Sequence, residues 1–414
     1  MSIDALRGFA VLGILLVNIV PMGLPFAAHN DPTIAGNRSA ADFWAWAITF
    51  VVAEGRMRAI FSMLFGASVL LLSARIESRA GTDSAADIHL RRNLWLILFG
   101  TVHSVWLLWP GDILFTYGVA GLPLFAFRRL RPRTLILLGA IVLALQVPRT
   151  AYHNMGLAEA SAGLRSLSGI EAGRALTPEE RESRARWREG LAEEKPTAES
   201  LRRTIENHRS GYLASLGLSA EATVYLESEY LYTTGLWDAA GPMLIGMGLL
   251  SLGVLSAARS YRFYVVMALL GYAIGIPLAI WVAADWMLHG FEAGTRWASL
   301  DDLTRISVAI GHVAVVTMIC KARALPWITK PLADIGRMAL TNYVLQTIIC
   351  TTLFAGFGFG LFGQLARHQL YYIVLGIWLF EWIASVLWLR RFRFGPLEWV
   401  WRWLTYRQRP AIRI

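Results

Sequence analysis

The sequence predicts an all-α integral membrane protein, a polytopic helical bundle of about ten transmembrane helices with a helical extracytoplasmic insert. Three observations predict this class. Only 16% of the 414 residues are charged, whereas a soluble domain averages about 25%. Apolar runs of about 18 residues or more recur from end to end, which is long enough to cross a bilayer as a helix. Basic residues fall in every second loop between these runs, as the positive-inside rule requires of a polytopic protein.

The apolar runs define the expected helices in chain order. They cover residues 3–22, 42–74, 92–109, 112–127, 133–149, 235–256, 262–284, 303–320, 333–356 and 369–389. Residues 1–149 thus hold the first five transmembrane helices, residues 150–232 the insert, residues 233–389 the last five helices, and residues 390–414 a basic cytoplasmic tail.

The loops predict which way the bundle lies in the membrane. Alternate loops and the tail carry the arginines and lysines, among them Arg75, Arg128, Arg259, Lys321 and Arg390. The other short loops are poor in basic residues. This distribution predicts that both termini are cytoplasmic and that the insert is extracytoplasmic. The net charge of +10 is explained by the same loops, and because no recognition motif accompanies it, nucleic acid is not an expected partner.

The insert is the one polar segment, and its sequence predicts helices. Thr177 followed by Pro178 and Glu180 forms a capping pattern that predicts a helix start. A second helix is expected to begin near Thr197 and to continue through Tyr212. The insert is interpreted as a cap over the outer mouth of the bundle.

The first helix carries three polar residues that hydrocarbon does not tolerate unpaired. Asp4 and Arg7 are three residues apart and are predicted to form a structural ion pair. Asn18 lies 11 residues beyond Arg7, about three turns, and hence on roughly the same face. A simple membrane anchor would not need these groups.

The second span carries Glu54, Arg56 and Arg58. Glu54 and Arg58 are four residues apart and could pair with each other, which would lock the bundle. Alternatively, Arg56 and Arg58 could bind a phosphate or carboxylate of a substrate, because the guanidinium fork suits both groups.

Two further sets of polar residues are candidates. His103 and Asp112 lie on a tight helical hairpin, where the carboxylate could fix the imidazole tautomer for proton transfer. The alternative for His103 is a hydrogen bond to a backbone carbonyl. Arg337 and Asn342 lie in the ninth span and are candidate substrate-binding residues, Arg337 because it could attract phosphates. The alternative for Asn342 is an interhelical hydrogen bond. From the residues alone, His29 is an ordinary loop histidine.

Several chemistries are disfavoured. The two cysteines, Cys320 and Cys350, make no zinc spacing, and no metal site is expected. The sequence has no phosphate-binding loop, no Gly-x-Ser-x-Gly elbow and no zinc-binding His/Glu helix. An NTPase, a serine hydrolase and a metalloprotease are therefore not expected.

Five ordered segments resemble the YeiB-like membrane-protein family, known as domain of unknown function 418. They are residues 3–19, 56–66, 111–118, 336–343 and 395–406. The first segment also resembles the first helix of the transmembrane acyltransferase superfamily, which includes the acyltransferase-3 enzymes and heparan-α-glucosaminide N-acetyltransferase. The acyltransferase-3 enzymes carry their catalytic histidine where this chain has Asn18. The heparan-modifying enzyme is similar in having Asn there and its catalytic histidine 11 residues later, which in this chain is His29.

This resemblance implies an integral-membrane acyltransferase of the bacterial inner membrane. Acetyl-CoA or another acyl-CoA would be the cytoplasmic donor and co-substrate, and a glycan or envelope component would be the extracytoplasmic acceptor. His29, or else His103 with Asp112, would act as the base, Asn18 would orient the thioester or stabilise the oxyanion, and Arg56, Arg58 and Arg337 would attract the donor phosphates. The expected partners are membrane lipids and these two substrates, and the resemblance also suggests a homodimer.

The same buried charges leave a second interpretation open. A transporter or flippase could use them to bind an anionic substrate or to relay protons without covalent chemistry. A lipid- or quinone-binding protein is a related alternative, indicated only by the aromatic content.

Overall fold

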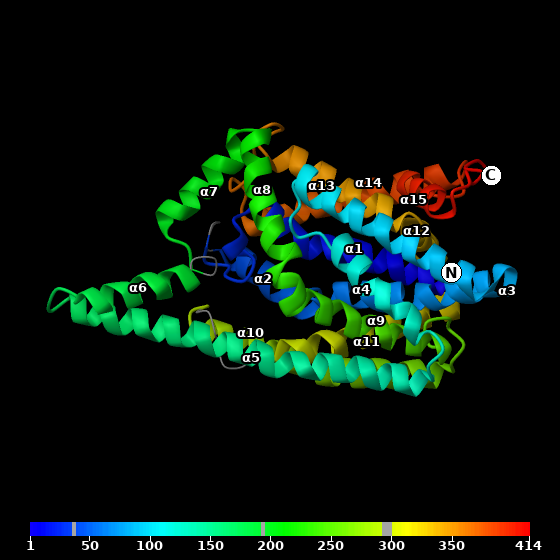
Figure 1. Cartoon of the computed structure of the whole chain (residues 1–414), viewed down its shortest axis with the longest axis horizontal. Coiled ribbons are helices and arrows are strands. Elements are labelled where there is room, and N and C mark those ends of the chain that lie inside the picture. The colour runs from blue at the N-terminus through cyan, green and yellow to red at the C-terminus, as the bar shows by residue number, and fades with distance from the viewer. Residues whose placement is uncertain (35–38, 192–194, 292–299) are drawn as a thin grey trace.

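The computed structural model describes residues 1–34, 39–191, 195–291 and 300–414. Within these ranges the chain is helical, and no strand is formed. Most of its helices run roughly along one long axis, and both termini lie at the same end of the bundle (Figure 1). The helices α6 and α7 project at the opposite end, and α8 leads back from α7 toward α9 at a steep angle to the long axis. We call these the terminal end and the insert end.

The N-terminal half contains α1 (Ser2–Gly23), α2 (Ala40–Val52), α3 (Arg56–Thr101), α4 (Leu114–Phe127) and α5 (Pro132–Glu171). The insert adds α6 (Pro178–Gly190), α7 (Ala198–Ser210) and α8 (Tyr212–Glu227). The remaining helices are α9 (Leu236–Ser251), α10 (Tyr261–Leu288), α11 (Asp301–Ala322), α12 (Pro326–Arg337), α13 (Ala339–Phe354), α14 (Arg367–Leu389) and α15 (Pro396–Tyr406). Short helical turns η1 (Phe26–Ala28), η2 (Val102–Trp106) and η3 (Leu231–Gly235) join some of them.

Several helices are apolar and long enough to cross a bilayer, which indicates a membrane protein. In the described part of the chain six segments meet this criterion, and α4 and α13 are shorter apolar helices. The six are Ser2–Gly23, Ala40–Ser78, Pro132–Glu171, Tyr261–Leu288, Asp301–Ala322 and Arg367–Leu389.

The long helix α3 folds back on itself. A Cβ atom built on Gly121 of α4 would lie 2.9 Å from the ring of Phe65 and 2.3 Å from Oδ1 of Asn93. In a straight helix these two residues would be about 42 Å apart. Residues 56–78, the first arm, and residues 84–101, the second arm, therefore run side by side against α4. This agrees with the separate spans expected over 42–74 and 92–109.

Two expected spans are broken in the structure. The span 42–74 is interrupted between α2 and α3, where Gly55 has φ of 67°, a left-handed conformation that glycine adopts without steric cost. The span 333–356 is interrupted at Met338, which separates α12 from α13. Apolar residues lie on both sides of each break, so a hydropathy window of about 18 residues runs across it and hydropathy alone does not reveal it.

The insert is helical as expected, with two changes of boundary. The span expected to end at residue 149 continues as α5 to Glu171, because the residues that follow are rich in helix-favouring alanine and leucine. Thr177 and Thr197 cap α6 and α7 with their side chains, which confirms both predicted helix starts. The second helix ends at Ser210 and does not reach Tyr212, because Gly211 has φ of 138°.

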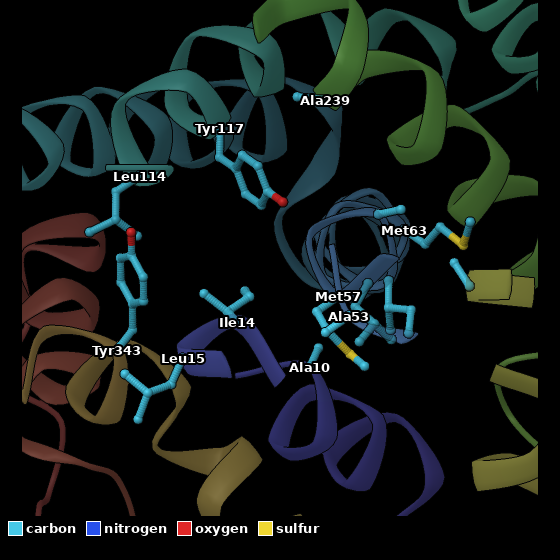
Figure 2. Close-up of a cluster of buried hydrophobic side chains, with 14 of the residues drawn as sticks. Ala10, Ile14, Leu15, Ala53, Met57, Met63, Leu114, Tyr117, Ala239 and Tyr343 are labelled. Atoms are coloured by element: carbon cyan, nitrogen blue, oxygen red, sulfur yellow. The ribbon is translucent and has the colours of Figure 1, made fainter. Parts of the chain in front are cut away.

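The core surrounds α1. Ala10, Ile14 and Leu15 of α1 face buried side chains of α3, α4 and α13, including Met57, Tyr117 and Tyr343 (Figure 2). Lipid tails are as apolar as these side chains, so such helices are held by close packing and by polar contacts between helices. Polar contacts between helices therefore contribute to holding this bundle together.

Candidate functional site

The break between α2 and α3 places polar groups inside the bundle. A helix end leaves backbone carbonyls without helical partners, and in a membrane these must be satisfied by other groups. His312 of α11 donates from Nε2 to the carbonyl of Val52, at 2.9 Å. Arg56 donates to the carbonyl of Glu54. The break is thus stabilised by side chains and brings Glu54 to the edge of a charged cluster.

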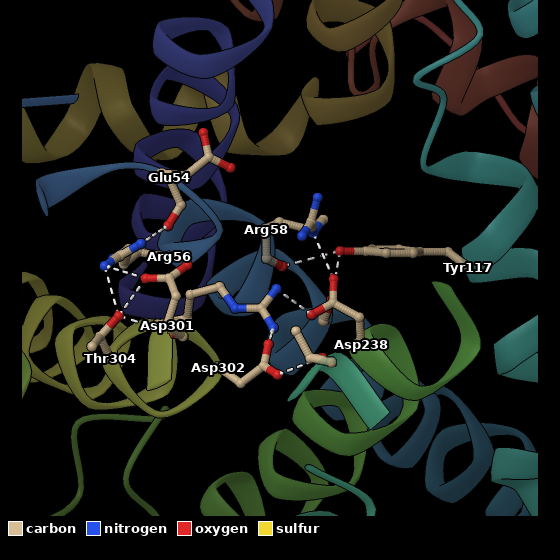
Figure 3. A network of polar contacts seen from close by, with 11 residues as sticks. Glu54, Arg56, Arg58, Tyr117, Asp238, Asp301, Asp302 and Thr304 are labelled. Carbon is tan, nitrogen blue, oxygen red and sulfur yellow. Dashed lines mark hydrogen bonds and ion pairs between the residues drawn. The ribbon is translucent and has the colours of Figure 1, made fainter. Parts of the chain in front are cut away.

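Arg56 begins α3 and is fully buried. Its guanidinium forms an ion pair with Asp301 at 2.9 Å and donates to the hydroxyl of Thr304 at 2.8 Å, both on α11 (Figure 3). Arg56 therefore ties α3 to α11.

Arg58 and Arg305 share one carboxylate, that of Asp238 on α9. Arg58 Nε lies 2.8 Å from Oδ2, and Arg305 Nη1 lies 2.7 Å from Oδ1 (Figure 3). Arg305 also pairs with Asp302, whose other oxygen accepts a 3.1 Å hydrogen bond from Thr150 of α5. Arg58 thus pairs with Asp238 and not with the Glu54 that its sequence spacing suggested.

Glu54 pairs instead with His29, at 3.0 Å between Oε2 and Nε2. The turn η1 positions His29, whose backbone N–H donates to the carbonyl of Phe26. The Phe26 ring stacks on the imidazole at 6.2 Å between centroids. The other ring nitrogen, Nδ1, is buried and has no hydrogen-bond partner among the described residues. His29 therefore has one nitrogen held by a carboxylate and one nitrogen free.

A small pocket lies beside His29 and Glu54. Its volume of about 10 Å³ is close to the least that holds one water molecule. Val17 and Val20 of α1, Thr49 of α2 and Arg367 of α14 also line it. Asn18 is not among the lining residues, although its neighbour Val17 is, and its side chain has no hydrogen bond in the described part of the chain.

Arg367 is not among the residues predicted from the sequence. This arginine opens α14, is 4% exposed and donates to the carbonyl of Ala28. No ion pair of its guanidinium is present among the described residues. A signal did exist, because Arg367 is a basic residue in a loop that parity places on the side poor in arginine and lysine.

The insert contacts the loops around this pocket. Lys195 pairs at 2.9 Å with Asp31, a buried residue two positions after His29. His208 of α7 stacks on Phe362, with centroids 4.2 Å apart and an interplanar angle of 6°, and this burial lowers the pKa of His208 below 6.5. The His29 pocket therefore lies at the insert end.

His103 and Asp112 form the pair expected from their spacing. Nδ1 of His103 lies 2.7 Å from Oδ1 of Asp112, and Nε2 lies 2.8 Å from the hydroxyl of Thr347 on α13. The second oxygen of Asp112 accepts the N–H of Phe115 at the start of α4. Both nitrogens of His103 are thus engaged by side chains, and the alternative of a bond to a backbone carbonyl is wrong.

The remaining predicted residues lie elsewhere. Asp4 and Arg7 form the predicted ion pair at 3.0 Å. Arg337 pairs with Asp334 at 3.3 Å and donates to the carbonyl of Arg393 in the C-terminal segment. These contacts belong to the terminal end, so Arg337 does not join the cluster of Arg56 and Arg58.

Asn342 makes the interhelical hydrogen bonds that the sequence suggested. Its amide donates to Ser385 of α14 at 3.1 Å and to the carbonyl of Ile335. Gln346, one turn later, donates to Glu381 of the same helix at 3.1 Å. Asn342 therefore joins α13 to α14 and does not line the His29 pocket.

The fold and the cluster define a class of protein, an all-helical membrane protein that encloses ionisable side chains within its bundle. The family described as "Protein of unknown function (DUF418)" matches residues 249–408. The chain is 32% identical to uncharacterized protein YeiB of Escherichia coli, over 100% of this chain and 98% of that protein. It is 26% identical to uncharacterized protein YxaH of Bacillus subtilis, over 98% and 93% of the two chains. An uncharacterized 39.9 kDa protein of Bacillus acidopullulyticus is 28% identical, over 99% and 94%.

The chain belongs to this YeiB-like DUF418 family. No solved structure shows a significant match to it.

Proposed function

We propose that this protein is an integral-membrane acyltransferase. It would move an acyl group, acetyl in the simplest case, from a cytoplasmic acyl-CoA to a hydroxyl or amine of an extracytoplasmic glycan or envelope acceptor. The observation that carries the proposal is the geometry of His29, whose Nε2 is held by Glu54 at 3.0 Å while Nδ1 is free beside a pocket. A carboxylate that holds one imidazole nitrogen and leaves the other free is the arrangement of a general base.

The chemical step uses the free nitrogen. Nδ1 of His29 takes the proton of the acceptor group, whose oxygen or nitrogen attacks the thioester carbonyl. The carbon–sulfur bond then breaks, and the proton passes to the leaving CoA thiolate. Glu54 stabilises the imidazolium that forms between these events. Arg367, a buried cation in the same pocket, stabilises the oxyanion, a role proposed from sequence for Asn18.

The arrangement of the helices supports the proposed topology. Ten membrane crossings with both termini in the cytoplasm of the bacterial inner membrane require the two termini to lie at one end, as they do in Figure 1. The pocket lies at the opposite end, under the insert, which suits an extracytoplasmic acceptor. Because the pocket has room for about one water molecule, the contacts between the insert and the bundle must open before substrates bind.

The test measures CoA thiol release by the purified protein in nanodiscs supplied with acetyl-CoA, with and without envelope glycans. His29→Ala and Glu54→Gln are expected to lower the rate, the former by about 10²- to 10⁴-fold as for a lost general base. His153→Ala is the matched control, because His153 is exposed on α5 and outside the pocket. Wild-type rates in His29→Ala would overturn the mechanism, and a loss confined to His103→Ala would move the base to the His103–Asp112 pair. Substrate flux into vesicles without any acyl donor would favour a transporter.

A further inference from the structure

A groove at the terminal end lies between the second arm of α3 and α15. Its volume is about 590 Å³, within the range of small-molecule sites in proteins. The indole N–H of Trp401 donates to the carbonyl of Arg92 at 3.0 Å, and the Arg92 guanidinium lies 4.3 Å from the Trp401 ring centroid. These two contacts hold α15 against α3 and fix the walls of the groove.

The walls are apolar. Leu94 and Leu98 of α3 are 50% and 47% exposed, and Trp403 of α15 is 36% exposed. Leu94 and Leu98 are four residues apart and share one helical face with Arg91, which lies one turn earlier. Along this face a cation is followed by apolar side chains over about 10 Å.

The polar end of the groove is cationic. Arg91 pairs with Asp87 at 2.9 Å, yet its Nε is buried and has no partner among the described residues. Arg407 also lines the groove, and no ion pair of its side chain occurs in the described part of the chain. The guanidinium of Arg409 lies 4.9 Å from the ring of Trp403 at the same end. Positive charge therefore exceeds negative charge where the groove opens.

We propose that this groove binds an anionic phospholipid, with the phosphate between Arg91 and Arg407 and an acyl chain along Leu94 and Leu98. Arginine binds phosphate through its planar fork. The apolar wall fits a lipid acyl chain, which a soluble phosphate anion does not have. The second arm of α3 runs from Arg91 at the terminal end toward the middle of the bundle. A lipid headgroup at Arg91 and an acyl chain along Leu94 and Leu98 would therefore have the same direction as the lipids of the leaflet on the terminal side. Tryptophan is enriched where a membrane meets water, and Trp403 is a partly exposed wall of this groove. The proposal is independent of the acyltransferase chemistry.

The experiment compares phosphatidylglycerol with phosphatidylcholine of identical acyl chains, added to the delipidated full-length protein and counted by native mass spectrometry. The wild type is expected to prefer phosphatidylglycerol. Two arginines at a membrane surface contribute about a 30-fold preference. The Arg91→Gln/Arg407→Gln variant is expected to lose it. The matched control is Arg262→Gln/Arg391→Gln, which removes two exposed arginines outside the groove and should keep it.

Three results would overturn the proposal. These are equal binding of the two lipids to the wild type, an unchanged preference in Arg91→Gln/Arg407→Gln, and displacement of the lipid by inorganic phosphate alone. Leu94→Asn/Leu98→Asn separates the two parts of the ligand, because it should weaken lipid binding while leaving the cations in place. If the glutamine variant does not fold, Arg91→Lys/Arg407→Lys takes its place, because it retains both charges. It is expected to keep a reduced preference for phosphatidylglycerol, and a complete loss of this preference would count against the site.

Discussion

The crossing of α1 and α12 depends on two glycines, and replacing one of them tests how the bundle is packed. A Cβ atom on Gly8 would lie 1.9 Å from the carbonyl oxygen of Leu332, and one on Gly336 would lie 1.8 Å from the carbonyl oxygen of Asp4. In Gly8→Ala the two backbones would have to separate by about 1.5 Å to reach ordinary contact at 3.4 Å. Backbone cannot swing aside as a side chain can, so we expect a cost near the upper end of overpacking, about 3 kcal/mol. The better helix propensity of alanine offsets about 1 kcal/mol, leaving a loss of about 2 kcal/mol.

Gly376→Ala is the matched control for this change. Gly376 lies within α14, and apart from the neighbouring backbone of its own helix no atom lies within 4 Å of the Cβ position, so only the propensity gain of about 1 kcal/mol is expected. Both free energies of unfolding can be measured by reversible unfolding in mixed micelles. If Gly8→Ala is as stable as the wild type, or if Gly376→Ala loses as much, the close crossing does not hold α1 in place.

Three further outcomes follow from the polar contacts. Asp238→Asn removes the carboxylate that the buried Arg305 shares with the partly exposed Arg58. Because Arg305 keeps Asp302 and Arg58 is partly solvated, we expect a loss of about 3 kcal/mol in the same unfolding assay, the lower end for a broken buried pair; a loss below 1 kcal/mol would contradict this. Because burial lowers the folded-state pKa of His208 below 6.5, its stacking on Phe362 stabilises the insert above that pH and weakens as the pH falls below it. The protection factors of the amides of residues 356–363, which correct for the intrinsic pH dependence of exchange, should therefore fall between pH 7.5 and 5.5, and His208→Phe should abolish the fall. Hydrogen bonds from Arg174 lower the pKa of Glu180 from 4.5 to about 2, so the start of α6 should hold above pH 4.5 and lose order as the pH falls toward 2. The protection factors of its amides, corrected for the intrinsic exchange rate at each pH, should fall over this range.

Local patterns in the sequence predicted the features that depend on neighbouring residues. The pairs Asp4–Arg7 and His103–Asp112 form because each lies on one helix or one tight hairpin. The caps at Thr177 and Thr197 form for the same reason, since the hydroxyl reaches an amide three residues away.

Features that depend on a distant helix were not predictable from spacing. Glu54 and Arg58 satisfy the i, i+4 rule, which describes an isolated helix. In the bundle, Gly55 ends that helix, and each side chain meets a better partner from elsewhere, His29 for Glu54 and Asp238 for Arg58. Arg367 also reaches the pocket from a helix that is distant in sequence, α14, so residue spacing near His29 could not indicate it. His29 was suggested by its distance of 11 residues from Asn18, which resembles the spacing in the heparan-modifying enzyme. Its pairing with Glu54 depends on the fold and could not be predicted from that spacing.

The two candidate histidines differ in whether a substrate proton can reach them. A general base needs one nitrogen free and within hydrogen-bond distance of the group it deprotonates. In His103 both nitrogens are occupied, by Asp112 and Thr347, and the side chain is 1% exposed. In His29 one nitrogen is free, and the side chain is 18% exposed. A substrate at His103 would have to displace a hydrogen bond between η2 and α13, at a cost in stability. At His29 the free Nδ1 already lies beside the pocket, so once the insert contacts open no hydrogen bond of the imidazole has to break. The geometry therefore favours His29 as the base and His103 as a bond that holds the hairpin before α4 to α13.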